Sequence, residues 1–508
     1  MFKWIGNLFK SSSSTGNSVT DASSHGPRTR YAKRERNILD TIRDIHVARG
    51  RIRAEYINNS SLAAAINCVS NFTVGSNGVS VVFNSEKKSA RRLDLIDRVQ
   101  EQWRKWAWSS KCDTELSSNL MNVQWQICNN VRLDGFVFFE VIHDLTGIFI
   151  RTHSCDRLAD NLHEDLDNGN FIRFGVEYNA SRIKVAYWFR GDDELKKYLH
   201  GGIYTGDSRK SCIRYPVDKM MMCYRPDRIG MPFGLPSLLS CFLTGRSIKT
   251  FTDAELQKQS IASSITGFIT SELEESDAPL MDIQKPPIGG GYTERDKQRN
   301  LDTLDIPIST MERLRDGESV TFPNPPNSEN FSSFTDQILG FMSMSQGITK
   351  EFFLGDFSKT NYSSARMAAS INSLPTSALR KNVIQAQLLE MVIPVFLENL
   401  YLAKNFPRQV TDLGWNYLAP TMPAVDPVKQ AKADMDDLNN GIKSLTTIMT
   451  ERGLNPEKEF DKIREEREKY KDVFEFFKQK EPKGAGELDE EEESGSNQEG
   501  NSDNPEEN

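Results

Sequence analysis

Three short segments of this 508-residue chain combine side chains that can act as nucleophiles, bases or metal ligands. Residues 153–156 (His-Ser-Cys-Asp) have the types of a nucleophile with a neighbouring base. Adjacency in sequence does not supply the partner geometry that catalysis needs, so this segment is interpreted as a turn at a strand end. Residues 143–144 (His-Asp) and 163–165 (His-Glu-Asp) lack the ligand spacing of a zinc site. The sequence therefore predicts no catalytic, metal or cofactor-binding residue, and no enzyme.

Motifs for nucleotide and redox chemistry are also missing from the sequence. The glycines at 289–291 follow two prolines rather than a strand, and no Gly-x-x-x-x-Gly-Lys-Ser/Thr loop occurs, so no ATPase is predicted. The cysteines are dispersed, odd in number and without a Cys-x-x-Cys pair, which favours reduced, mostly buried thiols in a cytoplasm. They are Cys68, Cys112, Cys128, Cys155, Cys212, Cys223 and Cys241.

The net charge of −8 is concentrated at one end of the chain. Residues 481–508 contain eleven acids and one lysine, which predicts a disordered acidic tail and leaves the remainder close to neutral. Residues 1–27 are rich in Ser, Gly, Asn and Thr and predict a flexible arm, although a short membrane-touching helix over residues 1–10 stays open. No apolar run approaches the ~20 residues needed to cross a bilayer.

The elements that would position any site begin with an α+β domain over residues 28–235. Residues 28–53 predict a basic amphipathic helix whose charged face either packs on the body or contacts nucleic acid or an acidic neighbour. Helices are then expected over 59–71, ending before Gly75 and Gly78, and over 116–133. A further helix is expected through Leu93 to Trp106, with its tryptophans packed in the core. A strand is expected from Val79, and further strands between 135 and 189.

The second half of the chain is predominantly helical. A long helix is predicted over 236–269, a Pro- and Gly-rich module with short strands over 270–328, and a second helix over 329–348 with Phe331, Phe334, Ile338 and Phe341 on one stripe. Residues 349–362 interrupt the helical pattern, and helices resume over 363–424. Within residues 425–480 one helix is predicted from Asp426-Pro427 to Gly453, with a buried stripe of Leu438, Ile442, Leu445 and Met449. The next helix is predicted to start at Asn455-Pro456.

Three blocks in a fixed order carry a resemblance to a known family. They are YRPDRIGMPFGLP at 224–236 with DAEL at 253–256, NYSSAR at 361–366, and Trp415 followed by VDPVKQAKA at 425–433. Together they resemble the portal proteins of lambda-like tailed bacteriophages, from about Asn58 to about Gly453. Each block alone is weak, and their ordered occurrence outweighs two alternatives. These are a helical oligomeric scaffold or adaptor without a DNA channel, and a nucleic-acid-processing enzyme with an unusual site.

The resemblance implies a domain organisation and a function. The fold would be the phage portal fold, assembled as a ring that the family usually makes of twelve subunits. It would comprise a wing (28–235), a first stem helix (236–269), a clip (270–328), a second stem helix (329–348), a tunnel loop (349–362), wing return helices (363–424) and a crown (425–480). Such a ring sits at one capsid vertex of the virion and conducts double-stranded DNA during packaging and ejection. Its partners would be its own copies, the terminase large subunit, major capsid and scaffolding proteins and a head-tail adaptor, with assembly in the host cytoplasm and no membrane required.

The resemblance also selects residues around the tunnel loop. Lys350 and Lys359 are candidates for brief phosphate contact, or alternatively pair with Glu351 or Asp356 of a neighbouring subunit. Six further residues are expected to support a moving loop rather than catalysis. Gly347 and Gly355 would act as hinges, Asn361, Ser363 and Ser364 favour a helix start with one of the serines as cap, and Arg366 would form an inter-subunit or intra-loop salt bridge.

Overall fold

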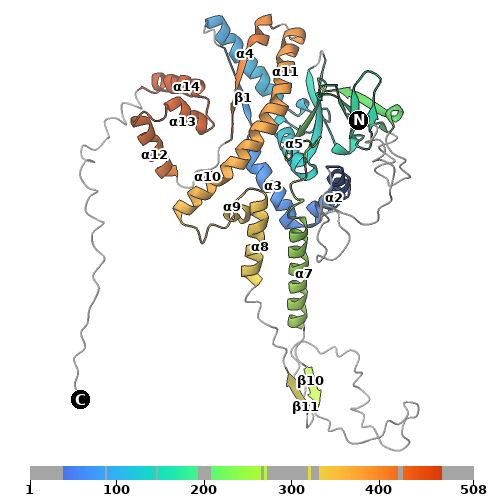
Figure 1. The fold of residues 1–508 in the computed structure, drawn as a ribbon. Helices are drawn as coiled ribbons and strands as arrows, with labels where there is room; N and C mark the ends of the chain where they lie inside the picture. The colour runs from blue at the N-terminus through green and yellow to red at the C-terminus, as the bar shows by residue number, and fades with distance from the viewer. Residues whose placement is uncertain are drawn as a thin grey trace, which may run out of the picture. The chain divides into compact units, whose positions relative to one another are not determined.

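The structure is a computed structural model of the chain, and Figure 1 draws its fold. The described residues are 38–85, 89–144, 147–192, 208–264, 268–271, 318–321, 331–404, 406–420 and 427–471. They form both helices and strands, so the predicted α+β class is confirmed. The predicted N-terminal arm, most of the 270–328 module and the acidic tail lie outside the described residues.

The chain divides into two compact units, each built from three stretches of sequence. Unit 1 comprises Met1–Val69, Asn129–Val137 and Tyr224–Thr376. Unit 2 comprises Ser70–Cys128, Phe138–Cys223 and Ser377–Asn508.

The described part of unit 1 is mainly helical. Its helices are α2 (Ile38–Asn58), α3 (Ser60–Val74), α7 (Phe242–Ser264), α8 (Phe331–Ser345), α9 (Lys350–Leu354) and α10 (Tyr362–Leu379). One apolar core joins helices that are distant in sequence, and burial of this kind stabilises a fold by roughly 25 cal/mol per Å² of apolar surface. The buried core residues are Ala48, Ile52, Leu62, Ala65, Ile66, Leu133, Leu238, Cys241, Phe242, Ile248 and Met342.

Helices α7 and α8 lie side by side, and the chain between them contains the antiparallel strands β10 (Phe268–Ser271) and β11 (Glu318–Thr321) (Figure 1). The ring of Phe251 on α7 stacks on that of Phe331 on α8 at a centroid distance of 5.3 Å. The helix predicted over 236–269 is shorter than expected, because Ser237 donates both its N–H (2.8 Å) and its hydroxyl (3.0 Å) to the carbonyl of Arg132. These two hydrogen bonds hold the residues just before Phe242 in turns, so the helix begins only at Phe242.

The arginines of α2 that the structure describes in detail bind to the protein itself. The Nε of Arg49 donates to the carbonyl of Asp134 at 2.7 Å, and its guanidinium lies 4.7 Å from the ring centroid of Phe136. The Nε of Arg53 pairs with the carboxylate of Asp134 at 2.7 Å. Of the two interpretations of this basic helix, these contacts support packing on the body.

Two sheets form the strand region of unit 2. The three-stranded sheet has the order β3-β2-β9, and the five-stranded sheet is an antiparallel meander in the order β4-β5-β6-β7-β8. The predicted strands between 135 and 189 are confirmed, but two more strands follow the expected end of the set. The bounds are β2 (Phe136–His143), β3 (Ile148–His153), β4 (Glu164–Asp165), β5 (Phe171–Arg173), β6 (Val176–Tyr178), β7 (Lys184–Arg190), β8 (Cys212–Pro216) and β9 (Met220–Tyr224).

A two-stranded ribbon pairs β1 (Ser80–Asn84) with β12 (Gly414–Leu418), more than 300 residues later in the chain. Glutamine side chains complete the hydrogen bonding along β1 and the residue before it. Gln100 on α4 (Ala90–Ala107) accepts from the N–H of Phe83 at 3.1 Å and donates to the carbonyl of Val81 at 2.8 Å. Gln124 on α5 (Leu120–Asp134) does the same for both backbone groups of Val79, at 2.7 and 3.1 Å. A side-chain amide thus replaces a third strand on this edge.

Trp103 of α4 belongs to the core, as predicted, and Trp106 is half-buried beside it. The ring of Trp103 is buried and meets Phe83 edge-on at 5.8 Å and Phe396 at 4.9 Å. Phe396 lies on α11 (Glu390–Ala403), so these three rings join the ribbon to two helices of unit 2.

Helix α10 continues without a break through a π-helical segment (Arg380–Leu389) into α11, and Pro375 lies inside this continuous helix. Arg380 donates to the carbonyls of Thr73 (2.7 Å) and Phe72 (3.1 Å) and so satisfies the last turn of α3. Contrary to the sequence-based expectation, the stretch Tyr362–Ala403 is long and apolar enough for a membrane span by length and composition alone. A core helix meets the same criteria, and 56% of this apolar window is buried inside the protein.

The C-terminal helices differ from the prediction in two ways. The single helix expected up to Gly453 is two helices, α12 (Pro427–Asn439) and α13 (Leu445–Glu451), because Gly441 adopts φ +68° and the N–H of Ile442 turns back to the carbonyl of Asp437 at 2.8 Å. The predicted buried stripe is wrong for the single chain, since Ile442 and Leu445 are exposed. Helix α14 (Pro456–Lys469) starts at the predicted Asn455-Pro456 pair.

Candidate functional site

The candidate site is the segment of unit 1 that joins α8 to α10, where the predicted loop residues lie. Helix α8 ends in a Schellman turn, with the N–H of Ile348 bonded to the carbonyl of Ser343 (3.1 Å) and that of Gly347 to Met344 (3.0 Å). Gly347 has φ +78°, and a Cβ built there would lie 3.3 Å from the Cβ of Pro375. Only glycine fits this left-handed position without strain. Whether Gly347 moves as a hinge stays a prediction.

Asn372 of α10 holds the residue that follows this turn. Its Oδ1 accepts from the N–H of Thr349 at 2.8 Å, and its Nδ2 donates to the Thr349 hydroxyl at 3.3 Å. The side chain of Asn372 is fully buried, so both bonds are shielded from water. The base of the segment is therefore fixed to α10 before the chain reaches the candidate lysines. Sequence reasoning missed Asn372, because no local pattern marks a contact 23 residues away.

Lys350 is part of a helix rather than of an open loop. Helix α9 occupies the first part of the predicted 349–362 loop, and Lys350 is its first residue. Its ammonium pairs with the carboxylate of Asp336 on α8 at 2.9 Å. The sequence did not predict this partner, and it reduces the availability of Lys350 for phosphate.

Lys359 lies in the exposed part of the segment, which bends back on itself. Gly355 ends α9 with φ +68° and open space around its Cα. The rings of Phe352 and Phe357 meet edge-on at 5.2 Å. The N–H of Ser358 donates to Asp356 at 2.9 Å; hydrogen bonds from Ser358, followed by the charges of the nearby lysines, lower the pKa of that carboxyl. This turn presents the Lys359 side chain to solvent.

Asn361, and neither serine, caps α10. Its Oδ1 accepts from the N–H of Ser364 at 2.8 Å, and its carbonyl accepts from Ala365 at 2.9 Å. Assigning the cap to Ser363 or Ser364 is therefore wrong, because these residues already lie in the first turn of the helix. Arg366 is exposed and forms no ion pair with the described part of the chain, so only the inter-subunit alternative stays open for it.

A buried cluster of polar side chains fixes the end of α8, where the candidate site begins. Arg132 donates to the side-chain oxygen of Gln346 at 2.7 Å and to the carbonyl of Ala65 at 3.1 Å. Gln346, the last residue before Gly347, donates in turn to the carbonyl of Ser237 at 3.0 Å and to the thiol of Cys241 at 3.4 Å. One side chain thus connects the end of α8 with the start of α7, and no sequence motif indicates it.

The segments with reactive residue types are structural. Ser154 caps a short 3₁₀ helix and its hydroxyl donates to Asp156 at 3.0 Å, while Cys155 is buried, so the predicted strand-end turn is confirmed. His153 bonds to Glu140 at 3.1 Å; burial lowers the pKa of this imidazole, and the carboxylate opposes that effect. In the described ranges, no cluster of three His, Cys, Asp or Glu side chains could hold a metal.

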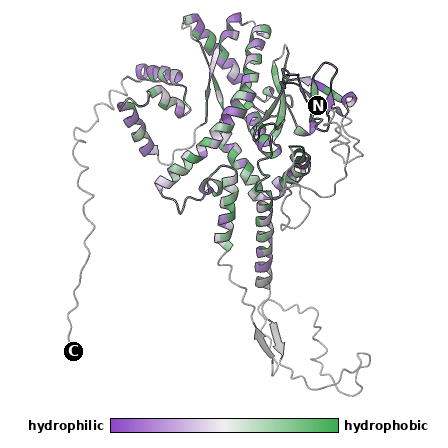
Figure 2. Ribbon diagram, in the orientation of Figure 1, coloured by the Kyte–Doolittle hydropathy of each residue, from purple (hydrophilic) through white to green (hydrophobic). Residues whose placement is uncertain are grey.

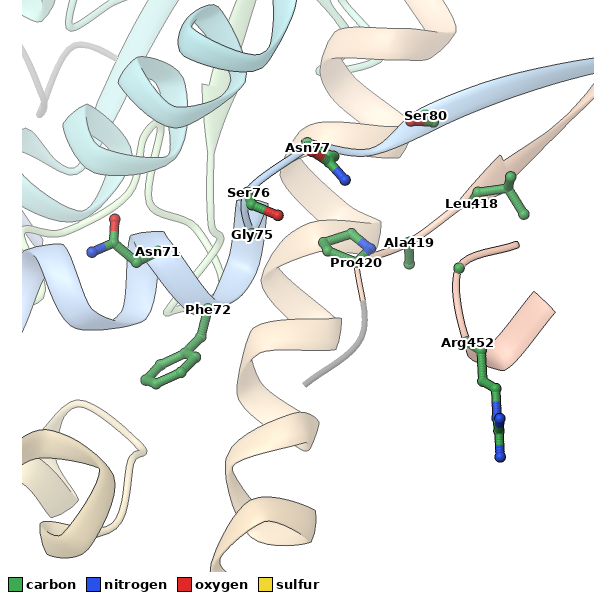
Figure 3. A pocket seen from close by; sticks show the side chains of 12 residues that line it. Asn71, Phe72, Gly75, Ser76, Asn77, Ser80, Leu418, Ala419, Pro420 and Arg452 are labelled. Carbon is green, nitrogen blue, oxygen red and sulfur yellow. The ribbon is translucent and has the colours of Figure 1, made fainter. Parts of the chain in front are cut away.

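A cavity of about 560 Å³ lies in unit 2, between the turn after α3, the end of β12 and the end of α13 (Figure 3). Its lining includes polar side chains such as Asn71, Ser76 and Asn77. Arg452 is the only charged residue of the lining, and its guanidinium bonds to Asp434. Without a further titratable group this cavity has no chemistry of its own, and it contains none of the predicted site residues.

Comparisons with known proteins identify the family of the chain. The family model for phage portal proteins of the lambda family matches residues 25–373. A probable portal protein of Halomonas phage phiHAP-1 is 22% identical over 442 residues, which cover 84% of this chain and 81% of that protein.

Two solved structures also resemble the chain at low identity. The neck of an empty gene transfer agent particle, computed with C6 symmetry, is 12% identical, with a TM-score of 0.46 over 79% of this chain and 92% of that chain. An HK97-family phage portal protein from Corynebacterium diphtheriae is 10% identical, with a TM-score of 0.30 over 75% and 98%. Both TM-scores are too low to transfer geometry. The family match alone extends over more than two thirds of the sequence, from residue 25 to residue 373, and the chain therefore belongs to the lambda family of phage portal proteins.

Proposed function

We propose that copies of this chain assemble into a ring at one capsid vertex and form the conduit for double-stranded DNA. Terminase would package the genome through this ring, head-tail adaptors would attach to it, and the genome would later leave by the same route. The observation that carries the proposal is the portal family match over residues 25–373. The chain would act in the virion after assembly with capsid and scaffolding proteins in the host cytoplasm.

The domain roles follow the order of the elements. Residues 28–235 and the return helices 363–424 would form the wing, α7 and α8 the two stem helices, and the module between them the clip that faces terminase and adaptor. The segment from Thr349 to Tyr362 would be the tunnel loop, and α12–α14 the crown. The β10–β11 pairing between two side-by-side helices supports the assignment of stem and clip.

The charges of α7 suit a conduit that must not hold DNA tightly. Arg246 lies 3.7 Å from Glu55, Lys249 donates to the carbonyl of Asn58 at 2.7 Å, and Lys258 pairs with Glu255 at 3.4 Å. Each phosphate that a free cation neutralised would add to a salt-dependent affinity and slow translocation. Cations that already have partners in their own chain contribute less of this friction.

The two candidate lysines differ in their availability for phosphate contact. Lys359 is exposed on a preformed turn, whereas Lys350 pairs with Asp336. We therefore expect Lys359→Gln to change the packaging rate and its salt dependence more than Lys350→Gln does. Single-molecule packaging with each variant measures this difference. Equal rates for wild type and Lys359→Gln would remove Lys359 from the proposal.

The ring itself is tested by negative-stain microscopy with mass determination on the purified full chain. We expect closed rings whose channel admits duplex DNA. A solid oligomer without a channel, in the presence and absence of capsid and scaffolding proteins, would favour the helical scaffold or adaptor instead. Hydrolysis or ligation of nucleic acid by the purified chain with a divalent metal would favour the enzyme alternative.

A further inference from the structure

Helix α10 turns three of its large apolar side chains away from the chain that it belongs to. Met367, Ile371 and Leu374 recur at i, i+4 and i+7 and are all exposed, Met367 by 62% and Leu374 by 70%. The opposite face is buried and, apart from Leu379 in the last turn, is made of small or polar residues: Ala365, Ala368, Asn372 and Thr376. Single exposed apolar residues are normal on protein surfaces. A continuous apolar stripe on the solvent-facing side of a helix indicates an interaction surface.

Helix α8 carries a second exposed stripe. Phe334, Phe341 and Met344 recur at i, i+7 and i+10, and Phe341 and Met344 are 68% and 73% exposed. The other face of α8 packs with Ile338, Leu339 and Met342 in the core of unit 1. Hydrophobic residues therefore occupy much of the helix, as Figure 2 shows. Phe334 also meets the ring of Phe251 on α7 edge-on at 5.4 Å, so Phe341 and Met344 are the most exposed part of this stripe.

We infer that the α10 stripe of one copy packs on the α8 stripe of the next copy. The inference rests on the proposed ring and names the surfaces that build it. The α8 stripe and the α10 stripe are two different surfaces of the same chain, and both stay exposed in the single chain. One head-to-tail contact would bury both, and its repetition closes a ring without leaving either stripe in water. At ~1.5 Å per residue the α8 stripe extends about 15 Å along its helix and the α10 stripe about 10 Å, so the two stripes are comparable in length.

Charge supports a second copy as the occupant. Asp336 is the only charged residue of α8, and Arg366 is the only charged residue of α10. Each helix therefore carries a single charge and the two charges have opposite signs, although Asp336 is already paired with Lys350 of its own chain. Lys350 leaves the Asp336 side chain 38% exposed, so it can accept a further donor.

The first test removes the α10 stripe. The double variant Met367→Glu/Leu374→Glu places two charges in the inferred contact but at exposed positions of the single chain. We expect unchanged far-UV circular dichroism and loss of the oligomer in native mass spectrometry, at concentrations where the wild type is assembled. Ser373→Glu is the matched control, because Ser373 is partly exposed on the same helix but outside the stripe. A double variant that assembles as the wild type does would overturn the inference.

The second test identifies the partner surface. A photo-crosslinking benzoylphenylalanine at position 374 is introduced into a mixture of ¹⁴N- and ¹⁵N-labelled full-length chains, and crosslinked peptides are mapped by mass spectrometry. Mixed-isotope crosslinks to α8 support the contact. Crosslinks to another helix, to added lipid vesicles or to a different phage protein, or none to α8 in an assembled sample, would refute it.

The inference and the proposed ring can fail separately. Closed rings whose position-374 crosslinks avoid α8 would keep the portal function and reject this interface. An open or channel-less oligomer with α8–α10 crosslinks would keep the interface and reject the ring.

Discussion

Side chains of the five-stranded sheet of unit 2 find their partners within the chain, whereas the α8–α10 region of unit 1 leaves large apolar side chains exposed. In the sheet region even buried charged side chains have partners within the chain: Arg190 and Asp160 form a buried ion pair at 2.5 Å. Glu177 accepts hydrogen bonds from Arg214, Trp188 and Asn170. In the α8–α10 region the backbone turns are fully bonded, yet two stripes of large apolar side chains stay in solvent.

The contrast separates stability of the subunit from stability of the assembly. A residue of the sheet region contributes to the free energy of unfolding of a single chain, because its partners belong to that chain. A stripe residue of α8 or α10 contributes little there and should act on association. Substitutions in the two regions are therefore expected to change different measurements.

The largest effect should come from the buried ion pair of the sheet region. Asp160→Asn leaves the guanidinium of Arg190, whose side chain is 0% exposed, without its counter-charge. We expect a loss of about 3–5 kcal/mol in the free energy of unfolding, measured by urea titration with tryptophan fluorescence. The double variant Arg190→Met/Asp160→Leu is the control, since it removes both charges and should recover most of the loss. A single variant as stable as the wild type would show that this pair does not hold the sheet region together.

The next effect concerns Glu177 and depends on pH. Burial raises the pKa of this carboxyl, but hydrogen bonds from Arg214, Asn170 and Trp188 outweigh burial and leave the pKa below its ordinary value of 4.5. A lowered folded pKa contributes stability above pH 4.5, and this contribution is lost as the pH falls through the folded pKa. Glu177→Gln should therefore cost about 1.5–3 kcal/mol at pH 7 and progressively less below pH 4.5.

Urea titrations between pH 3 and pH 7 measure this dependence. Glu164→Gln is the matched control, because the Glu164 side chain is 39% exposed and pairs with Arg209 at 3.5 Å only. It should change stability little at any of these pH values. A pH-independent difference between the wild type and Glu177→Gln would contradict the assigned hydrogen bonding.

Local patterns predicted the helices and strands of the chain better than the contacts between them. Gly75 and Gly78 correctly marked the change from α3 to β1, and the apolar spacing of Trp103 correctly placed it in the core. The β1–β12 pairing was not predictable, because both of its strands are short and its register joins residues such as Val82 and Asn416 across the chain. Nor could sequence show that glutamine side chains would close the β1 edge.

The errors at the C-terminal helices and at the candidate site have physical causes. Apolar spacing through Ile442 and Leu445 indicates a face that avoids water, but it does not say which chain covers that face. Asn361, Ser363 and Ser364 are all good capping residues, so only the position of the first helical turn selects Asn361. The identification of the family survived these errors because it depended on the order of three motif blocks and not on any one contact.

A smaller effect is expected at the glycines of the candidate site. Gly347→Ala meets both a left-handed backbone and the Cβ of Pro375 at 3.3 Å, whereas Gly355→Ala meets only the backbone penalty. We expect about 2 kcal/mol of destabilisation at Gly347 and about 1 kcal/mol at Gly355. Thermal unfolding measures both, and Gly355→Asn should recover part of the loss because Asn tolerates this conformation. If Gly355→Ala is the more destabilising substitution, the exposed turn is packed by something outside the single chain, and the contrast between the regions becomes sharper.

The smallest effect is at the start of α10. Asn361→Ala removes the acceptor of the Ser364 N–H and should cost about 1 kcal/mol, whereas Ser363→Ala and Ser364→Ala should be close to neutral. Amide hydrogen exchange reports this locally, and we expect faster exchange at Ser364 only in the Asn361 variant. If Ser363→Ala or Ser364→Ala has the larger effect instead, these serines bond to a neighbouring copy. The first turn of α10 would then belong, with the stripe that follows it, to the surface that only the assembly completes.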